Sequence, residues 1–336
     1  MNNLLFIFFL FIQISLSLSE LRQNIPYEYE VAPWYSFKDA VITYSFDDGT
    51  PNHLRKAIPL LDKYNLKASF NLITNKNIND WRGYKTAAEN EHEMASHTVS
   101  HPNLQEIDYQ TQVEELKESK KLIEKMVGQE CVTLVYPYCV PGDYDIAKKY
   151  YISGRSCSHQ YIDSNPDDMF DLSSFGIGNE SNHQTGEDLN EIVDKAVEQK
   201  KWVVFLIHGV DFDDGDAYSP FEASELEKHF QYVTKKDNFW VATFKDVSKY
   251  ILEANSLNIF ENLNMEGNTI IRVTTGYKTD ITKLDVPVTV SRVVDEQYKK
   301  VNIIRESDNN SIHVEMKNGK IIFDVVPGEK YIMKCE

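Results

Sequence analysis

The chain has 336 residues, of which 42% are hydrophobic and 26% are charged, a composition typical of a folded globular protein. This length allows one large domain and a small one. The formal net charge of −17 argues against nucleic acid and against an anionic membrane surface as partners, because both attract basic protein surfaces.

The first 19 residues are typical of a secretory signal peptide. Leu4 to Leu18 are almost wholly apolar, and Ser17-Leu18-Ser19 forms a small-x-small cleavage pattern directly before Glu20. The apolar run is short for a transmembrane helix, but no Lys or Arg precedes it, which leaves an uncleaved anchor as the alternative. We expect a secreted or extracytoplasmic protein whose mature chain begins near Glu20.

Strand-like and helix-like patterns alternate between residues 41 and 252. Alternation of this kind predicts parallel strands with helices packed outside them. In such α/β folds the chemistry takes place at the carboxyl ends of the strands. The expected strands are 41–46, 68–73, 131–136, 202–207 and 240–243, and the expected helices are 53–64, 85–93, 109–127, 144–151, 189–199, 224–234 and 245–252.

The helical period disappears after about Ala254, and short alternating segments follow. Asn318-Gly319 lies between two of them, a strong signal for a two-residue β-hairpin. We therefore interpret residues 256–336 as a small β-sandwich that follows an α/β domain of residues 20–255. The expected strands of this second domain are 270–274, 286–293, 301–304, 312–316, 321–326 and 331–334.

Two adjacent acids, Asp47 and Asp48, end the expected strand 41–46, and Gly49 follows them. Two carboxylates at the end of a buried strand cost desolvation energy unless a metal, a cation or a shared proton compensates them. Taken alone, these residues fit an Asp-Gly turn that caps the next helix. Two further expected strands end on Pro137-Tyr138 and on His208.

His97 and His101 are four residues apart. On a helical turn this spacing places both imidazoles on one face, as metal binding by paired histidines requires. Two imidazoles and one carboxylate would form a three-ligand site with an open position, the pattern of a catalytic zinc site. Two histidines on a helix surface are the simpler alternative, but the acids and His208 at strand ends argue against coincidence.

Five segments between about residues 38 and 252 resemble, in order, the motifs of the polysaccharide deacetylase family, the NodB homology domain of carbohydrate esterase family 4. The first two motifs, in this order and at this spacing, are the most specific. The matching segments are Ser45-Phe46-Asp47-Asp48-Gly49 for Thr-Phe-Asp-Asp-Gly, His97-Thr98-Val99-Ser100-His101-Pro102 for His-Ser/Thr-x-x-His-Pro, Tyr136-Pro137-Tyr138 for Arg-Pro-Pro-Tyr-Gly, Leu206-Ile207-His208 for Leu-Leu-His, and 240–251 for the closing strand and helix.

The resemblance implies a distorted (β/α) barrel and a divalent metal, with zinc as the expected ion. It implies that Asp48, His97 and His101 are the metal ligands. By the same resemblance Asp47 is the general base that activates water, and His208 is the general acid. The Tyr138 backbone N–H would hold the oxyanion, and Leu206 would line the acetyl pocket.

The chain departs from the family pattern at the third motif. The arginine that pairs with the catalytic Asp falls on Val135, and the glycine of that motif falls on Cys139. The fourth motif has no clear counterpart. Arg155, on the next element, is the candidate for orienting the base in place of the missing arginine.

We therefore expect a secreted, metal-dependent deacetylase whose partner is an acetylated polysaccharide or oligosaccharide. The expected bond is the N-acetyl amide of chitin or a related glycan. One alternative is an O-acetyl esterase acting on acetylated xylan or a similar glycan. Another is a catalytically weak carbohydrate-binding protein on the same fold.

Two groups of residues leave structural questions open. Export would allow disulfides, and the four cysteines can pair in three ways that the sequence does not distinguish. An acidic cluster directly after His208 favours a flexible, solvated lip beside the active site. The cysteines are Cys131, Cys139, Cys157 and Cys335, and the acids are Asp211, Asp213, Asp214 and Asp216.

Overall fold

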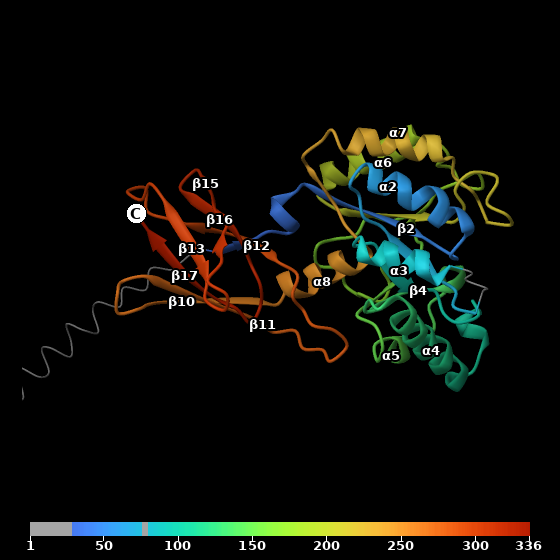
Figure 1. Cartoon of the computed structure of the whole chain (residues 1–336), viewed down its shortest axis with the longest axis horizontal. Coiled ribbons are helices and arrows are strands. Elements are labelled where there is room, and N and C mark those ends of the chain that lie inside the picture. Colours follow the sequence, from blue (N-terminus) through green and yellow to red (C-terminus); the bar gives the residue numbers. More distant parts are fainter. Residues whose placement is uncertain (1–28, 76–79) are drawn as a thin grey trace, which may run out of the picture.

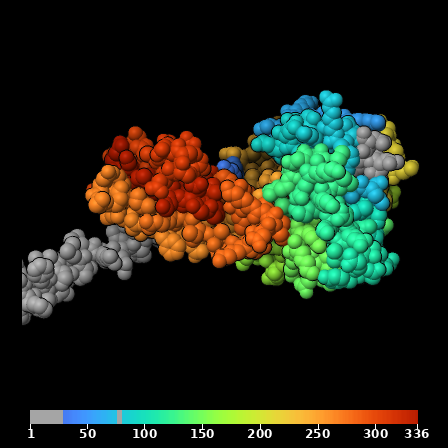
Figure 2. Space-filling model, turned by 60° about the horizontal axis from the view of Figure 1, so that its bottom comes forward, coloured from blue at the N-terminus to red at the C-terminus, as the bar shows by residue number. Residues whose placement is uncertain are grey.

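The computed structural model describes residues 29–75 and 80–336, so the expected signal peptide lies outside the described residues. Two bodies of different secondary structure follow one another along the chain (Figure 1). The space-filling view shows them as two lobes joined by a narrower region (Figure 2). Among the helices of the described ranges, none has the length and apolar character needed to span a bilayer.

The first lobe is built on one curled sheet in which all strand pairs are parallel. The strand order is β6-β5-β4-β3-β2-β8-β7, and β9 pairs with β2. This arrangement confirms the distorted (β/α) barrel. The strands are β2 (Ala40–Phe46), β3 (Ser69–Leu72), β4 (Glu93–Ser96), β5 (Thr133–Val135), β6 (Ser153–Arg155), β7 (Phe175–Gly176), β8 (Trp202–Ile207) and β9 (Phe239–Val241).

Helices alternate with these strands and pack outside the sheet (Figure 1). Local capping sets their bounds: Asp80 accepts from the Gly83 N–H and starts α3 four residues before the expected 85–93 helix. Gly128, at φ 81°, ends α4. The helices are the π-helix η2 (His53–Ala57), α2 (Ile58–Lys63), α3 (Trp81–Glu89), α4 (Tyr109–Val127), α5 (Tyr144–Ala147), α6 (Gly186–Gln199), α7 (Ala223–Val233) and α8 (Phe244–Ala254), with 3-10 turns η1 (Tyr35–Phe37), η3 (Leu104–Glu106) and η4 (Pro137–Cys139).

Every residue of β2 is buried, because neighbouring strands flank it and helices cover the sheet. Its continuous apolar pattern is the one expected of a strand inside a parallel sheet. The core residues of the two neighbouring strands include Phe70 of β3 and Phe205 of β8. A strand buried this completely fixes the position of the residues that follow its last residue.

The second lobe consists of two antiparallel sheets, which confirms the C-terminal β domain. The sheet orders are β1-β12-β16-β15 and β10-β11-β17-β13-β14. Asn318 and Gly319 have φ values of 51° and 71° and join β15 to β16, as the hairpin signal predicted. The strands are β1 (Tyr29–Val31), β10 (Leu257–Leu263), β11 (Thr269–Thr275), β12 (Val288–Val293), β13 (Val301–Arg305), β14 (Ser311–Ile312), β15 (Glu315–Lys317), β16 (Lys320–Val325) and β17 (Lys330–Cys335).

The expected division of the chain at residue 255 needs a correction, because β1 precedes the barrel in sequence but belongs to the sandwich. Val31 of β1 pairs with Val290 of β12. Tyr250 of α8 also joins the sandwich core, and its hydroxyl donates to the Ala32 carbonyl at 2.8 Å. A three-residue edge strand is too short to show a hydrophobic period, so this pairing was not predictable from the local pattern.

Candidate active site

Asp47 and His208 lie side by side because they follow paired residues on neighbouring strands. Phe46 of β2 is in register with Ile207 of β8, and the Asp47 N–H donates to the Ile207 carbonyl at 2.8 Å. Asp48 then adopts a left-handed φ of 76°, which turns the chain sharply. As a result the two adjacent acids differ in environment: Asp47 is 2% exposed, whereas Asp48 is half-buried.

Asp47 accepts two hydrogen bonds from buried side chains. Arg155 Nη2 donates to its Oδ2 at 2.5 Å, and Asn71 Nδ2 donates to its Oδ1 at 2.6 Å. Burial raises the pKa of Asp47, but its interactions with neighbouring groups, of which the Arg155 charge is the strongest, outweigh burial and hold the pKa below its ordinary value. Asp47 is therefore an ionised carboxylate at neutral pH. The expected contact between Arg155 and Asp47 is present.

Asp48, His97 and His101 form a three-residue cluster that could hold a metal ion, with one donor atom from each lying within 4.8 Å of the others. Asp48 Oδ1 is 3.6 Å from His97 Nε2 and 3.9 Å from His101 Nε2. Ligands bound at about 2 Å around one zinc-type ion are separated by similar distances. The donor set therefore fits a divalent metal.

His97 is prepared to act as a neutral ligand. Its Nδ1 donates to the Val135 carbonyl at 2.9 Å, which leaves Nε2 as the donor toward the cluster. Burial lowers the pKa of His97 to about 4, so the imidazole is uncharged at neutral pH. Val135 stands where the family motif has arginine, and its backbone carbonyl orients the His97 ring.

The loop that carries the two histidines is not helical, which corrects the geometry expected from their spacing. β4 ends at Ser96, and Thr98 and His101 adopt left-handed φ values of 65° and 60°. The Glu115 carboxylate of α4 holds this loop by accepting the Val99 and Ser100 N–H groups, both at 2.8 Å. Sequence reasoning missed Glu115, because an acid on an amphipathic helix normally faces solvent.

Tyr138 contacts the histidine cluster, whereas Leu206 lines a cavity together with His208. The Tyr138 ring packs edge-on against the His101 ring, with 4.6 Å between centroids. Leu206 and His208 line a cavity of about 500 Å³. The other lining residues are His159, Gly176, Ile177, Glu180, Ser181, Asn182, His183, Tyr218 and Ser219.

His208 is held through its backbone and its ring face. His53 Nε2 donates to the His208 carbonyl at 2.6 Å, and the Tyr218 ring packs edge-on against the His208 ring at 5.1 Å. Its Nδ1 is buried without a hydrogen-bond partner among the described residues. No side chain of the described part therefore fixes which ring nitrogen carries the proton.

Residues 35–150 match the family model described as polysaccharide deacetylase. Over these residues the chain is similar to the polysaccharide deacetylase family. One curated relative is a putative polysaccharide deacetylase, YxkH, from Bacillus subtilis, which is 32% identical over 97 residues, 28% of this chain and 35% of that protein. Another is a gellan lyase from a Bacillus species, which is 25% identical over 314 residues, 87% of this chain. The chain spans only 12% of that second relative's length.

Solved structures support the fold of this deacetylase domain. A putative polysaccharide deacetylase from Mycobacterium smegmatis superposes with a TM-score of 0.52 at 14% identity, over 66% of this chain and 95% of that one. Puue allantoinase superposes with a TM-score of 0.52 at 8% identity, over 66% of this chain and 92% of that one. At these identities the likeness concerns the barrel alone.

The acidic segment after His208 is a structured part of the deacetylase domain, so the expected flexible lip is wrong. Asp214 is 2% exposed. Its carboxylate accepts the Thr50 hydroxyl and the Asn52 N–H, both at 2.7 Å. Lys56 Nζ donates to Asp211 and Asp213 at 2.6 Å each. These acids connect the loop after β8 to the segment that follows Asp47 and Asp48, and composition alone could not reveal such partners.

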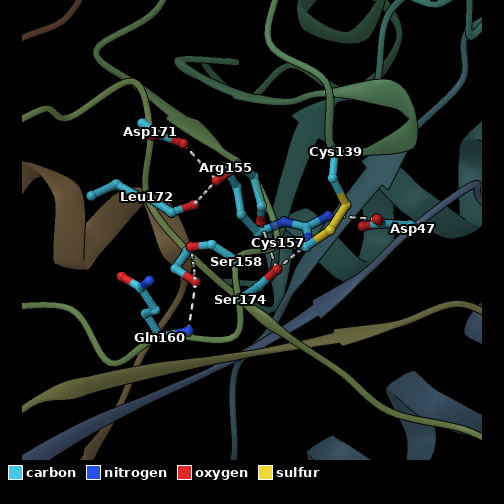
Figure 3. The surroundings of a disulfide bond; sticks show 11 residues. Asp47, Cys139, Arg155, Cys157, Ser158, Gln160, Asp171, Leu172 and Ser174 are labelled. Atoms are coloured by element: carbon cyan, nitrogen blue, oxygen red, sulfur yellow. Dashed lines mark hydrogen bonds and ion pairs between the residues drawn. A yellow bond between two sulfur atoms is a disulfide. The ribbon is translucent and has the colours of Figure 1, made fainter. Parts of the chain in front are cut away.

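The structure selects one of the three cysteine pairings. Cys139 and Cys157 form a disulfide, whereas Cys131 and Cys335 are free. Figure 3 draws this disulfide together with the interaction between Arg155 and Asp47. The bridge therefore belongs to the surroundings of the active site of the deacetylase domain.

Proposed function

We propose that the chain is a secreted, metal-dependent hydrolase that removes N-acetyl groups from a polysaccharide built of amino sugars, such as chitin or a related glycan. One observation carries the proposal: an ionised, arginine-held Asp47 lies at the end of β2, beside the three-ligand cluster and beside His208 at the end of β8. Polysaccharide deacetylases are hydrolases, and this set of groups suits hydrolysis of an acetyl group.

The cluster of Asp48, His97 and His101 would hold the metal, for which zinc is our proposal. A divalent ion bound there would act as a Lewis acid on the acetyl carbonyl and would lower the pKa of water. The chain's own side chains divide the remaining work. Asp47 takes a proton from the attacking water, and Arg155 keeps Asp47 ionised and oriented for this step.

Two further groups act on the acetyl group and on the leaving group. The Tyr138 backbone N–H would donate to the oxyanion that develops when the carbonyl is attacked. Leu206, which lines the cavity with His208, would contact the acetyl methyl group. His208 would then protonate the departing amine, which leaves poorly without a proton. Base and acid are thus different residues in different environments.

Charge and cysteine chemistry support the partner and the compartment in this proposal. The net charge of −17 does not repel a neutral glycan and attracts one that gains free amines as it loses acetyl groups. The Cys139–Cys157 disulfide is typical of a protein that folds in an oxidising compartment.

One observation favours an O-acetyl esterase as a second candidate. His208 Nδ1 has no hydrogen-bond partner among the described residues, so no carboxylate of that part accepts a hydrogen bond from this ring nitrogen. An alkoxide leaves more readily than an amine anion. Hydrolysis of an ester therefore depends less on a general acid than hydrolysis of an amide does. The same residues would otherwise act as described.

Acetate release from N-acetylglucosamine oligomers and from acetylated xylan, measured with the zinc-loaded full chain, tests both candidates. We expect release from the amino-sugar oligomers, and a larger loss for His208→Ala on the amide than on the ester. Release from acetylated xylan alone would replace the proposal by the second candidate. Release from neither substrate would contradict both candidates.

A further inference from the structure

The Cys139–Cys157 disulfide joins two segments that each carry an active-site group. Cys139 directly follows Tyr138, and Cys157 lies two residues after Arg155. The bridge spans 18 residues of sequence, including α5, with 5.5 Å between its Cα atoms. It therefore connects the proposed oxyanion donor to the arginine that holds Asp47.

The segment on the Cys139 side has an unfavourable backbone conformation. Tyr138 and Cys139 both have left-handed φ values, 57° and 61°. Each such residue other than glycine costs on the order of 1 kcal/mol, so neighbouring structure must hold the pair in place. The Cys139 N–H donates to the Tyr136 carbonyl and the Val140 N–H donates to the Pro137 carbonyl. Both hydrogen bonds lie within the turn and do not connect it to another segment.

The segment on the Cys157 side belongs to an edge strand. β6 pairs with β5 through three residues and ends the sheet. Arg155 must extend from this edge to Asp47, and its Nη1 donates to Ser174 Oγ at 2.8 Å. Its Nε is buried without a hydrogen-bond partner among the described residues. Leu172 pairs with Arg155 on the outer side of β6, but this contact does not attach the strand to the Tyr138 turn.

One backbone hydrogen bond already links the two segments: the Tyr136 N–H donates to the Arg155 carbonyl at 3.2 Å. The disulfide adds a covalent link just beyond it in the sequence, and Figure 3 draws this link together with Arg155 and Asp47. Without the bridge, the Tyr138 turn could relax from its left-handed conformation while the pairing of β5 with β6 stays intact.

We propose that the Cys139–Cys157 disulfide is a positioning element of the active site, which holds the Tyr138 turn and the Arg155 strand end as one unit. This inference rests on the proposed function for the roles of Tyr138 and Arg155. Opening the bridge leaves the fold and the metal ligands in place but lets the two groups move. The chemical step then slows, while binding of the substrate changes little.

Tris(2-carboxyethyl)phosphine provides the test on the full zinc-loaded chain. The phosphine gives two electrons to the S–S bond, and one water molecule supplies the oxygen of the phosphine oxide and the two hydrogens of the resulting thiols. We expect kcat to fall by about tenfold or more, with KM within about twofold, because small misplacements of reacting groups cost rate rather than binding. Reoxidation should restore kcat.

Variants separate the cross-link from other effects of the reductant. The double substitution Cys139→Asn with Cys157→Ala removes the bridge but keeps a residue that tolerates left-handed φ. It should have the kcat of the reduced protein and no response to the phosphine. Cys335→Ser, which alters a free cysteine in the sandwich, should keep the wild-type kcat and the wild-type response. In the Arg155→Ala background the loss on reduction should be smaller, because one of the two positioned groups is absent.

Amide hydrogen exchange gives a readout that needs no substrate. Reduction should increase exchange at residues 136–140 and 155–157, with little change in the sandwich. Equal kcat and equal exchange in the oxidised and reduced proteins would overturn the inference. If the oxidised protein releases no acetate from any substrate, the proposed function is contradicted, and exchange still decides whether the bridge holds these two segments together.

Discussion

Arg155 contacts Asp47 from a strand that lies four places away in the sheet, with Nη2 of the guanidinium 2.5 Å from the carboxylate Oδ2. In the motif that the sequence resembles, the arginine would stand at Val135 on the neighbouring strand β5. The cation beside Asp47, which we propose as the base, is therefore present but comes from β6. Because both side chains are buried, removing one leaves the other uncompensated.

Arg155→Ala should raise the pKa of Asp47, because burial then acts without the strongest opposing charge. A base works only when it is deprotonated, so the acid limb of the pH profile for kcat/KM should move to higher pH. The profile of acetate release checks this expectation. Arg155→Lys, which keeps a positive charge, is the matched control and should move the limb less. An unchanged acid limb in Arg155→Ala would show that Arg155 does not set the pKa of the base.

Asp214→Ala should destabilise the protein and slow turnover, because the Thr50 hydroxyl and the Asn52 N–H both lose their acceptor. Loss of hydrogen bonds to a buried carboxylate predicts about 3 kcal/mol of lost stability. Urea unfolding measures this loss. Asp216→Ala, at an exposed position of the same loop, should behave as wild type. Equal stability of the two variants would contradict a structural role for Asp214 and would support the solvated acidic lip that composition suggested.

Glu253 of α8 makes stability depend on pH at the contact between the two lobes. Burial raises the pKa of Glu253 to about 8, although the Val286 N–H donates to one carboxylate oxygen. The folded protein therefore holds the proton more tightly than the unfolded chain does. The stabilisation that comes from tighter proton binding at Glu253 is fully present below the ordinary pKa of glutamate and is lost as the pH rises toward about 8.

Glu253→Gln keeps a neutral, hydrogen-bonding side chain at every pH, so it should reduce the loss of unfolding free energy between about pH 5 and about pH 8. Urea unfolding at both pH values provides the measurement. Glu296→Gln, at an exposed position, controls for the general change in net charge. The same pH dependence in wild type and Glu253→Gln would show that Glu253 does not couple stability to pH.

The sequence predicted the parts of the fold that rest on repeated local patterns. β8 runs over Trp202–Ile207, as its continuous apolar run indicated, and a sharp turn carries Asp47 and Asp48 out of β2. The strand ends then came together because carboxyl ends of parallel strands meet at one edge of a sheet. The contact between Arg155 and Asp47 was also foreseen, because the arginine of the resembled motif falls on Val135 and Arg155 is a nearby arginine on the next element.

Contacts between distant segments were not predictable from local patterns. The pairing of β1 with β12 depends on only three residues, and Glu115 looks like any polar residue of an amphipathic helix. The acids after His208 appeared solvated because their partners, such as Asn52, lie more than a hundred residues earlier in the chain. Such partners are visible only in the folded chain. The pairing of Cys139 with Cys157 is another contact of this kind.

The central claim is that the two adjacent acids have different roles, with Asp48 holding the metal and Asp47 acting as the base. Metal content and acetate turnover, measured together for Asp47→Asn and His97→Ala, test this claim most directly. Asp47→Asn should keep its metal, because Asp48, His97 and His101 remain, while turnover falls by a factor on the order of 10² to 10⁴. His97→Ala should lose both metal and turnover. An Asp47→Asn protein with full metal content and undiminished turnover would contradict the account.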